Sequence, residues 1–178
     1  MDLEGELLHN KMLESADESP DVVGLFNLVF FKSTMPRDQR RVSFFESIGF
    51  QHGTYAWLAI ADILSNVLLK HPLRIEEAAS RADAFMCNWW LAKPAWMKRY
   101  AEFACRAMEH AQTSSVARAY LSNKGFYAGA LSAERLSRIF GRDHYTLTPF
   151  VFERLPALFF ALEGADVRRG EYIVGWLL

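Results

Sequence analysis

The spacing of apolar positions predicts the first strand and the first long helix. The run VVGLFNLVFF, which begins after Asp21, is rich in β-branched and aromatic residues and too apolar for a surface strand. We therefore expect a buried strand there, because strands covered on both faces are apolar throughout. From Tyr55 to Lys70 apolar residues recur every three or four positions, which predicts a helix that His71 and Pro72 stop. Its expected buried face comprises Trp57, Ile60, Ala61, Leu64, Val67 and Leu68.

A second apolar run leads directly into another helical pattern. The run AFMCNWWLA at 84–92 is followed by Lys93 and by Pro94, which stands where proline is favoured in the first turn of a helix. The expected apolar face of that helix consists of Trp96, Tyr100, Phe103, Ala104, Ala107, Met108 and Ala111. A strand followed by a helix is typical of half of an α/β unit.

Two more helices are expected toward the C-terminus. Ser132 can cap a helix over 133–140, and Gly141 can end it in a left-handed conformation. A last helix is expected near 152–162. Because proline removes a backbone donor, Pro156 requires this helix to start at about residue 155 or to be kinked.

Together these patterns predict an α/β fold, a helix-rich single domain with a small, mostly buried sheet. A chain of 178 residues has the size of one ordinary domain. Residues 1–20 are expected to form an N-terminal helix, over 3–14, and a polar linker, and residues 21–178 the core. The stretch 33–53 is expected to be a long irregular connection, a kind of segment that often carries function.

Composition narrows the class of protein. With 51% hydrophobic and 14% aromatic residues, the chain can build a packed core, and the aromatic residues are expected to fill it. A net charge of −1 makes nucleic acid a poor partner. The two cysteines, Cys87 and Cys105, stand among apolar residues and are expected to be buried free thiols.

The N-terminal residues and the length of the apolar runs predict the cellular location of the protein. The first residues are acidic and polar, without the basic and then apolar plan of a secretion signal. No apolar run approaches the roughly 18 residues that crossing a bilayer requires. We expect a cytoplasmic protein, with a peripheral position at the inner face of the membrane as a further option.

The motifs of several self-contained enzyme classes are missing from the sequence. Two aspartates separated by one residue after a strand, which would hold a metal-bound nucleotide sugar, do not occur. Glycine-rich phosphate loops, nucleophile elbows and zinc-binding histidine pairs do not occur either. Catalysis has to be sought in polar residues within apolar surroundings, where each needs a partner or a purpose.

Asn88 and Trp89, inside the run FMCNWW, form the first candidate for substrate binding. The amide of Asn88 could hydrogen-bond a sugar hydroxyl while the flat face of Trp89 covers the C–H surface of a pyranose ring. The alternative is an asparagine that bonds neighbouring backbone within an aromatic core.

Glu153 and Arg154, in PFVFERLPALFFA, are two charges in a strongly apolar helix. Glu153 could act as general base on an acceptor hydroxyl, and Arg154 could bind a diphosphate. The alternative is an ion pair that anchors the end of a helix.

Loop residues supply the remaining candidates. His52, beside Gly53, is a candidate acid or base, and His144, beside Asp143, is a candidate substrate ligand. Arg37, Arg40 and Arg41 form the one compact basic cluster, which could neutralise a diphosphate or an anionic lipid headgroup. The alternative for all of them is a solvated loop.

The sequence resembles bacterial glycosyltransferases that build capsular and cell-wall polysaccharides. The resemblance rests on CNWWLAKPAWMKRYAEF and HYTLTPFVFERLPALFFAL and covers roughly residues 50–163. In that family a strand with an asparagine and an aromatic leads to a helix carrying tryptophan and tyrosine, and Glu-Arg-Leu opens the last helix. The matching positions are Asn88, Trp89, Trp96, Tyr100, Phe152, Glu153, Arg154 and Leu155.

The resemblance implies a domain that binds a nucleotide sugar or a glycan acceptor. The cofactor is not identified by the sequence, and a divalent metal accompanying the nucleotide sugar is the candidate implied. The family's nucleotide-binding region, with its acidic metal motif, has no counterpart before Asp21. Whether the chain is an enzyme is therefore left open. The competing hypothesis is a non-enzymatic module that docks on a protein or membrane surface through its aromatic residues and the segment YIVGWLL.

Overall fold

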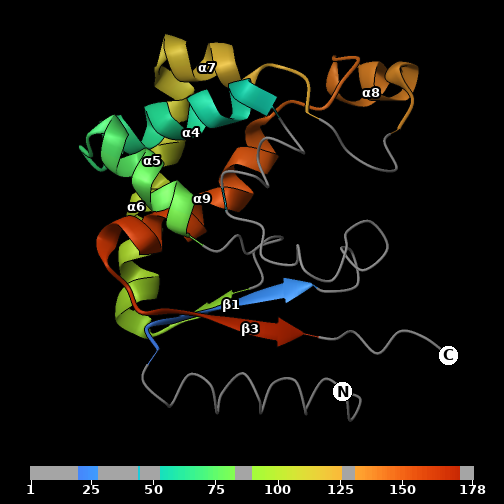
Figure 1. Ribbon diagram of the computed structural model, residues 1–178. Coiled ribbons are helices and arrows are strands. Elements are labelled where there is room, and N and C mark those ends of the chain that lie inside the picture. Colours follow the sequence, from blue (N-terminus) through green and yellow to red (C-terminus); the bar gives the residue numbers. More distant parts are fainter. Residues whose placement is uncertain (1–19, 28–43, 45–52, 83–89, 126–130, 173–178) are drawn as a thin grey trace, which may run out of the picture.

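The computed structural model describes residues 20–27, 44, 53–82, 90–125 and 131–172 (Figure 1). Within these residues the chain is helix-rich, as expected. The elements are β1 (Val22–Asn27), α4 (Gly53–Val67), α5 (Pro72–Arg81), β2 (Trp90–Ala92), α6 (Pro94–Thr113), α7 (Ser115–Leu121), α8 (Ala133–Phe140), α9 (Thr148–Glu163) and β3 (Val167–Tyr172). The predicted helix over 3–14 and nearly all of the connection 33–53 lie outside the described residues. Phe44, in that connection, is buried.

Three strands form a small mixed sheet in the order β2-β1-β3. β1 pairs antiparallel with β2, placing Val22 opposite Ala92, and parallel with β3, placing Val22 opposite Val167. The strand predicted after Asp21 is present as β1 over Val22–Asn27, and the rest of the predicted run lies outside the described residues. Val22 is buried, as expected. β3 was not predicted.

The α/β class with a mostly buried sheet is not confirmed. The labelled helices lie on one side of the sheet (Figure 1), whereas α/β folds usually carry helices on both faces. All three residues of β2 are partly exposed. The expectation of one domain over 1–178 stays a prediction.

The helix predicted from Tyr55 to Lys70 is present as α4 but ends at Val67. Its buried residues are Ala56, Ala59, Ile60, Ile63 and Leu64, so Trp57 and Ala61 lie at the edge of the face rather than at its centre. His71 was expected to stop this helix but lies beyond its end. Its side chain accepts a hydrogen bond from the backbone N–H of Leu73 and caps α5. The sequence analysis missed α5, whose buried residues are only Ile75 and Ala79.

α6 and α8 are confirmed. The buried residues of α6 are Phe103, Ala107 and Ala111, whereas Met108 is 41% exposed. Cys105 is exposed, which contradicts its predicted burial, because it lies between the inward positions of α6.

α9 begins at Thr148, not near residue 152, with Pro149 in its first turn. Pro156 lies inside the helix, where the missing N–H and the ring cost about 3 kcal/mol. Packing offsets that cost, since Leu155, Leu158 and Phe160 are fully buried. The sequence left two options for Pro156, and the one that starts the helix at about residue 155 is wrong. It considered only the local cost of proline and not the packing of the helix.

Aromatic rings from β2, α6 and α9 meet in the core, as the composition predicted. The ring centroids of Phe103 and Phe159 lie 4.8 Å apart, and those of Trp90 and Phe160 lie 5.2 Å apart. Tyr100 contacts Trp90 edge-on at 5.0 Å. α9 thus runs through the centre of the described helices and joins them to the sheet.

Candidate functional site

Three of the predicted site residues, His52, Asn88 and Trp89, lie outside the described residues. The basic cluster at 37–41 lies outside them too. Glu153 and Arg154 are on α9, and His144 precedes it.

Arg154 and Glu153 form the ion pair that was the alternative to a catalytic role. Arg154 is 4% exposed. Its Nη1 donates a hydrogen bond to the carbonyl oxygen of Phe150 at 3.2 Å and lies 3.5 Å from Oε2 of Glu153. These contacts engage Nη1 of the buried guanidinium within one turn of its own helix. The side chain of Glu153 is 23% exposed, so part of its carboxylate can be reached from solvent.

His144 joins two loops. Its Nδ1 lies 2.7 Å from Oδ1 of Asp143, and its Nε2 lies 3.1 Å from the carbonyl oxygen of Ser122 at the end of α7. The hydrogen bond to Asp143, followed by that to Ser122, raises the pKa of His144 above its usual range. With both ring nitrogens engaged, His144 connects parts of the chain rather than facing an open site.

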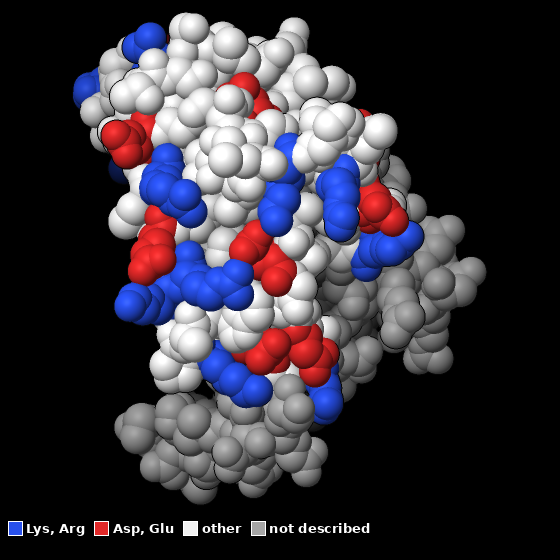
Figure 2. All heavy atoms as spheres, turned by 90° about the vertical axis from the view of Figure 1, so that its left-hand side faces the viewer, with Lys and Arg blue, Asp and Glu red and all other residues white. Residues whose placement is uncertain are grey.

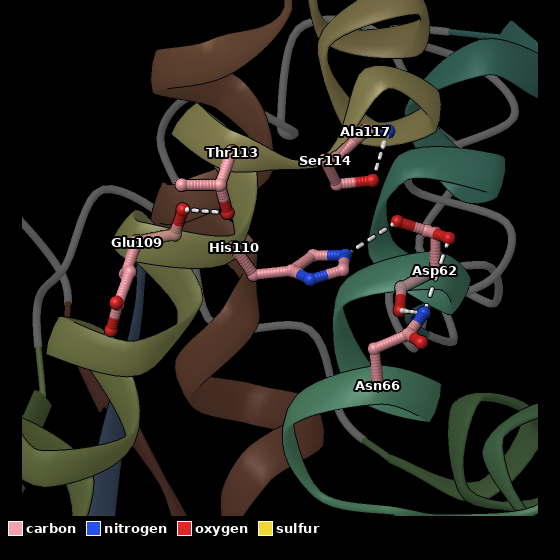
Figure 3. Close-up of polar contacts among 7 residues, drawn as sticks. All are labelled: Asp62, Asn66, Glu109, His110, Thr113, Ser114 and Ala117. Carbon is pink, nitrogen blue, oxygen red and sulfur yellow. Dashed lines mark hydrogen bonds and ion pairs between the residues drawn. The ribbon is translucent and has the colours of Figure 1, made fainter.

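Asp62 of α4 and His110 of α6 form a pair that the sequence analysis did not find (Figure 3). Nε2 of His110 lies 2.8 Å from Oδ2 of Asp62, and the two side chains are 20% and 18% exposed. Asn66 donates to Oδ1 of Asp62 at 3.2 Å. The nearby hydroxyl of Ser114 accepts a hydrogen bond from the N–H of Ala117 and caps α7. These contacts therefore connect α4 with α6 and cap α7. The hydroxyl of Ser114 is directed to the cap of α7 and not to His110, so the two do not form a nucleophile–base pair.

A hollow of about 550 Å³ lies between α5, the end of α9 and the start of β3. It is lined by Arg74, Glu77, Ala78, Arg81, Ala82, Ala161, Leu162, Ala165, Asp166 and Val167. Small apolar residues of both helices are too short to fill this space, and charged residues lie around it. Four of the lining residues are alanines, so side chains from neither helix fill the gap.

The charges around the hollow are of both signs. Arg74, Glu77 and Arg81 come from α5 at positions that share one side of a helix, and Glu77 and Arg81 form an ion pair at 2.7 Å. Asp166 stands at the entry to β3, where its N–H donates to the carboxylate of Asp21 at 3.0 Å. The four charged residues are exposed, which leaves them accessible to a bound molecule.

The wider surface carries no single-sign field on the face drawn in Figure 2. Lys and Arg side chains there alternate with Asp and Glu side chains. Glu163, at the end of α9, forms ion pairs with Lys70 and with Arg99. Such a face is typical of a solvated surface and not of a nucleic-acid interface.

Among the residues that the structure describes, no group of three histidine, cysteine or acidic side chains is arranged to hold a metal ion. None of the described helices has the length and apolar character needed to cross a membrane. The sequence could have indicated the hollow only through the i, i+3, i+4, i+7 spacing of Arg74, Glu77, Ala78 and Arg81 on an unrecognised helix.

Comparison of the chain with protein-family models, with curated proteins and with solved structures found no match. The resemblance to polysaccharide glycosyltransferases stays a prediction.

Proposed function

We propose that this chain is a glycosyltransferase-like domain that binds a nucleotide sugar or a glycan acceptor in the hollow between α5 and the end of α9. The observation that carries the proposal is the hollow itself, whose volume of about 550 Å³ lies within the range usual for small-molecule sites. With this function we also propose an α/β core around the small sheet and a cytoplasmic location.

The lining chemistry supports a ligand that is polar and partly anionic. Arg74 and Arg81 can donate paired hydrogen bonds to phosphate oxygens. Glu77 and Asp166 can accept hydrogen bonds from sugar hydroxyls. The alanine-rich floor offers an apolar surface to the C–H face of a pyranose ring.

Thermal unfolding with a panel of nucleotide sugars, free nucleotides and glycans, with and without Mg²⁺ or Mn²⁺, tests the proposal. A ligand at one hundred times its Kd should raise the midpoint by about 5–10 °C, because it binds only the folded state. Arg81→Ala, and separately Arg74→Ala, should weaken that ligand at least about ten-fold. The control is Arg118→Ala, an exposed arginine of α7 that does not line the hollow. If no ligand of the panel raises the thermal midpoint, the proposal is wrong.

Glu153 stays the proposed general base. It lies near the start of α9, outside the residues that line the hollow, so the acceptor would have to reach along the helix. Glu153→Gln should leave donor-induced stabilisation intact and abolish sugar transfer, because an amide cannot take the proton of an acceptor hydroxyl. Transfer at the wild-type rate in a product assay would exclude this role.

The second candidate function is a non-enzymatic interaction module. It is favoured by large apolar side chains that face solvent, among them Leu69, Leu73 and Phe140, which are 84%, 67% and 62% exposed. This function would be supported if no ligand raised the thermal midpoint and the chain formed a stable complex with another protein.

A further inference from the structure

α8 leaves most of its apolar side chains in solvent. Ile139 and Phe140 come three and four residues after Leu136, so the three side chains share one face. Leu136 is 3% exposed, whereas Ile139 and Phe140 are 53% and 62% exposed. In Figure 1, α8 stands apart from the group formed by α4, α5 and α6. Its apolar face is thus anchored at one position and uncovered at the other two.

One arginine of α8 lies beside this face. Arg135 neighbours Ile139 around the helix, whereas Arg138 lies on the opposite side. Arg142 follows the Gly141 cap, and all three arginines are exposed. None of the three has an ion-pair partner among the described residues. Glu134 and Asp143 are the acidic residues in the same stretch. Asp143 is already engaged, since it pairs with His144.

Uncovered apolar side chains beside unpaired arginines match the chemistry of an anionic bilayer surface. Apolar side chains enter the boundary between headgroups and acyl chains, while cations bind the phosphates. A protein partner is a poorer fit, because a specific interface buries about 800 Å² per partner and involves 20–30 residues. Two exposed apolar side chains on a helix of eight residues fall short of that. Pairing with a second copy would bring the arginines of two copies close together.

We propose that α8 is a docking site for anionic lipid bilayers, with Ile139 and Phe140 inserted and Arg135 and Arg142 bound to headgroup phosphates. This site is distinct from the hollow, whose lining residues lie in α5, α9 and β3 or next to their ends. Binding is reversible, since one short amphipathic segment is a weak anchor.

Co-sedimentation of the full chain with extruded vesicles tests the proposal. Vesicles of phosphatidylcholine are compared with vesicles containing 30% phosphatidylglycerol. We expect binding to the anionic vesicles at low salt and loss of binding at high salt, because the charges are screened. Ile139→Ser with Phe140→Ser should reduce the bound fraction at least about ten-fold. Replacing Arg135 and Arg142 by Gln should reduce the affinity by about 30-fold.

Matched control variants distinguish specific docking through α8 from nonspecific adsorption to vesicles and from misfolding. Leu73→Ser removes an equally exposed apolar side chain from α5, and Arg118→Gln removes an exposed arginine from α7. Both controls should bind as the wild type does. Thermal midpoints of all variants should agree, because the altered side chains are exposed.

Three outcomes would overturn the proposal. The first is no binding to either kind of vesicle. The second is equal binding to neutral and anionic vesicles that the α8 variants do not change. The third is a concentration-dependent dimer in light scattering, lost in the Ile139→Ser, Phe140→Ser variant and unaccompanied by vesicle binding, which would assign the face to self-association.

Discussion

Tyr100 packs into the aromatic core, and its pKa reflects this burial. Its ring packs against Trp90, Phe159 and Phe160, with centroids 5.0, 5.5 and 5.6 Å away. Burial raises the pKa of Tyr100 to about 12, because the apolar surroundings disfavour the phenolate.

This raised pKa predicts a loss of stability in alkali. Between pH 10 and about 12 the unfolded chain releases the proton of Tyr100 while the folded chain keeps it, so the free energy of unfolding falls as the pH rises. Urea unfolding at pH 9 and pH 11 should show a smaller decrease for Tyr100→Phe than for the wild type. Tyr55→Phe, at a tyrosine that is 53% exposed, is the control. Equal decreases in the wild type and in Tyr100→Phe would contradict the prediction.

For single residues, the sequence indicated which side chains are costly to bury more readily than it indicated which residues they contact. It identified Arg154 as a charge in apolar surroundings, which needs compensation. Phe150 and Glu153, both within one turn of α9, contact Nη1 of this guanidinium and supply part of that compensation. Asp62 and His110 carried no comparable signal, because 48 residues separate them and neither lies in an unusual local pattern.

At the scale of elements, local chemistry predicted α8 best. The hydroxyl of Ser132 accepts a hydrogen bond from the N–H of Arg135, and Gly141 ends the helix with φ of 67°. Both signals lie next to the helix end that they determine, so its bounds follow from the sequence. α5 was missed although its cap, His71, was noticed, because two buried residues make too weak a periodic pattern.

Asp21 connects the starts of three elements. Its carboxylate accepts a hydrogen bond from the N–H of Asp166 before β3 and lies 3.4 Å from Nζ of Lys93 before α6, while β1 begins at Val22. The backbone hydrogen bond of Asp166 is the main cause that lowers the pKa of Asp21 below its usual range. The link therefore depends on ionised Asp21.

This link predicts a stability difference that depends on pH. A lowered folded-state pKa contributes stability that is present above the ordinary aspartate pKa and is lost as the pH falls through the folded-state value. Asp21→Asn should therefore be less stable than the wild type in urea at pH 7, and the difference should vanish in strong acid. Glu76→Gln, at an exposed position of α5, is the matched control and should differ little at either pH. A difference independent of pH would show that the charge of Asp21 is not responsible.

For the whole molecule, α9 sets the relation between the two proposed surfaces. It follows α8 after the stretch 141–147, and its last residues line the hollow. At about 1.5 Å per residue, a helix from Thr148 to Glu163 is about 24 Å long. The hollow and α8 are therefore associated with opposite ends of α9, and a chain docked through α8 keeps the hollow away from the lipid.

The sequence by itself determined the elements whose signals are local: the apolar strand after Asp21, the amphipathic α6 and the capped α8. Periodicity and capping act within a few residues, so no knowledge of the fold is needed to recognise them. Only the tertiary structure decided that α9 continues through Pro156, that Asp62 meets His110, and that alanines of two distant helices leave a hollow. Each of these depends on packing between segments far apart in the chain, which offsets local costs and brings together residues that share no pattern in sequence.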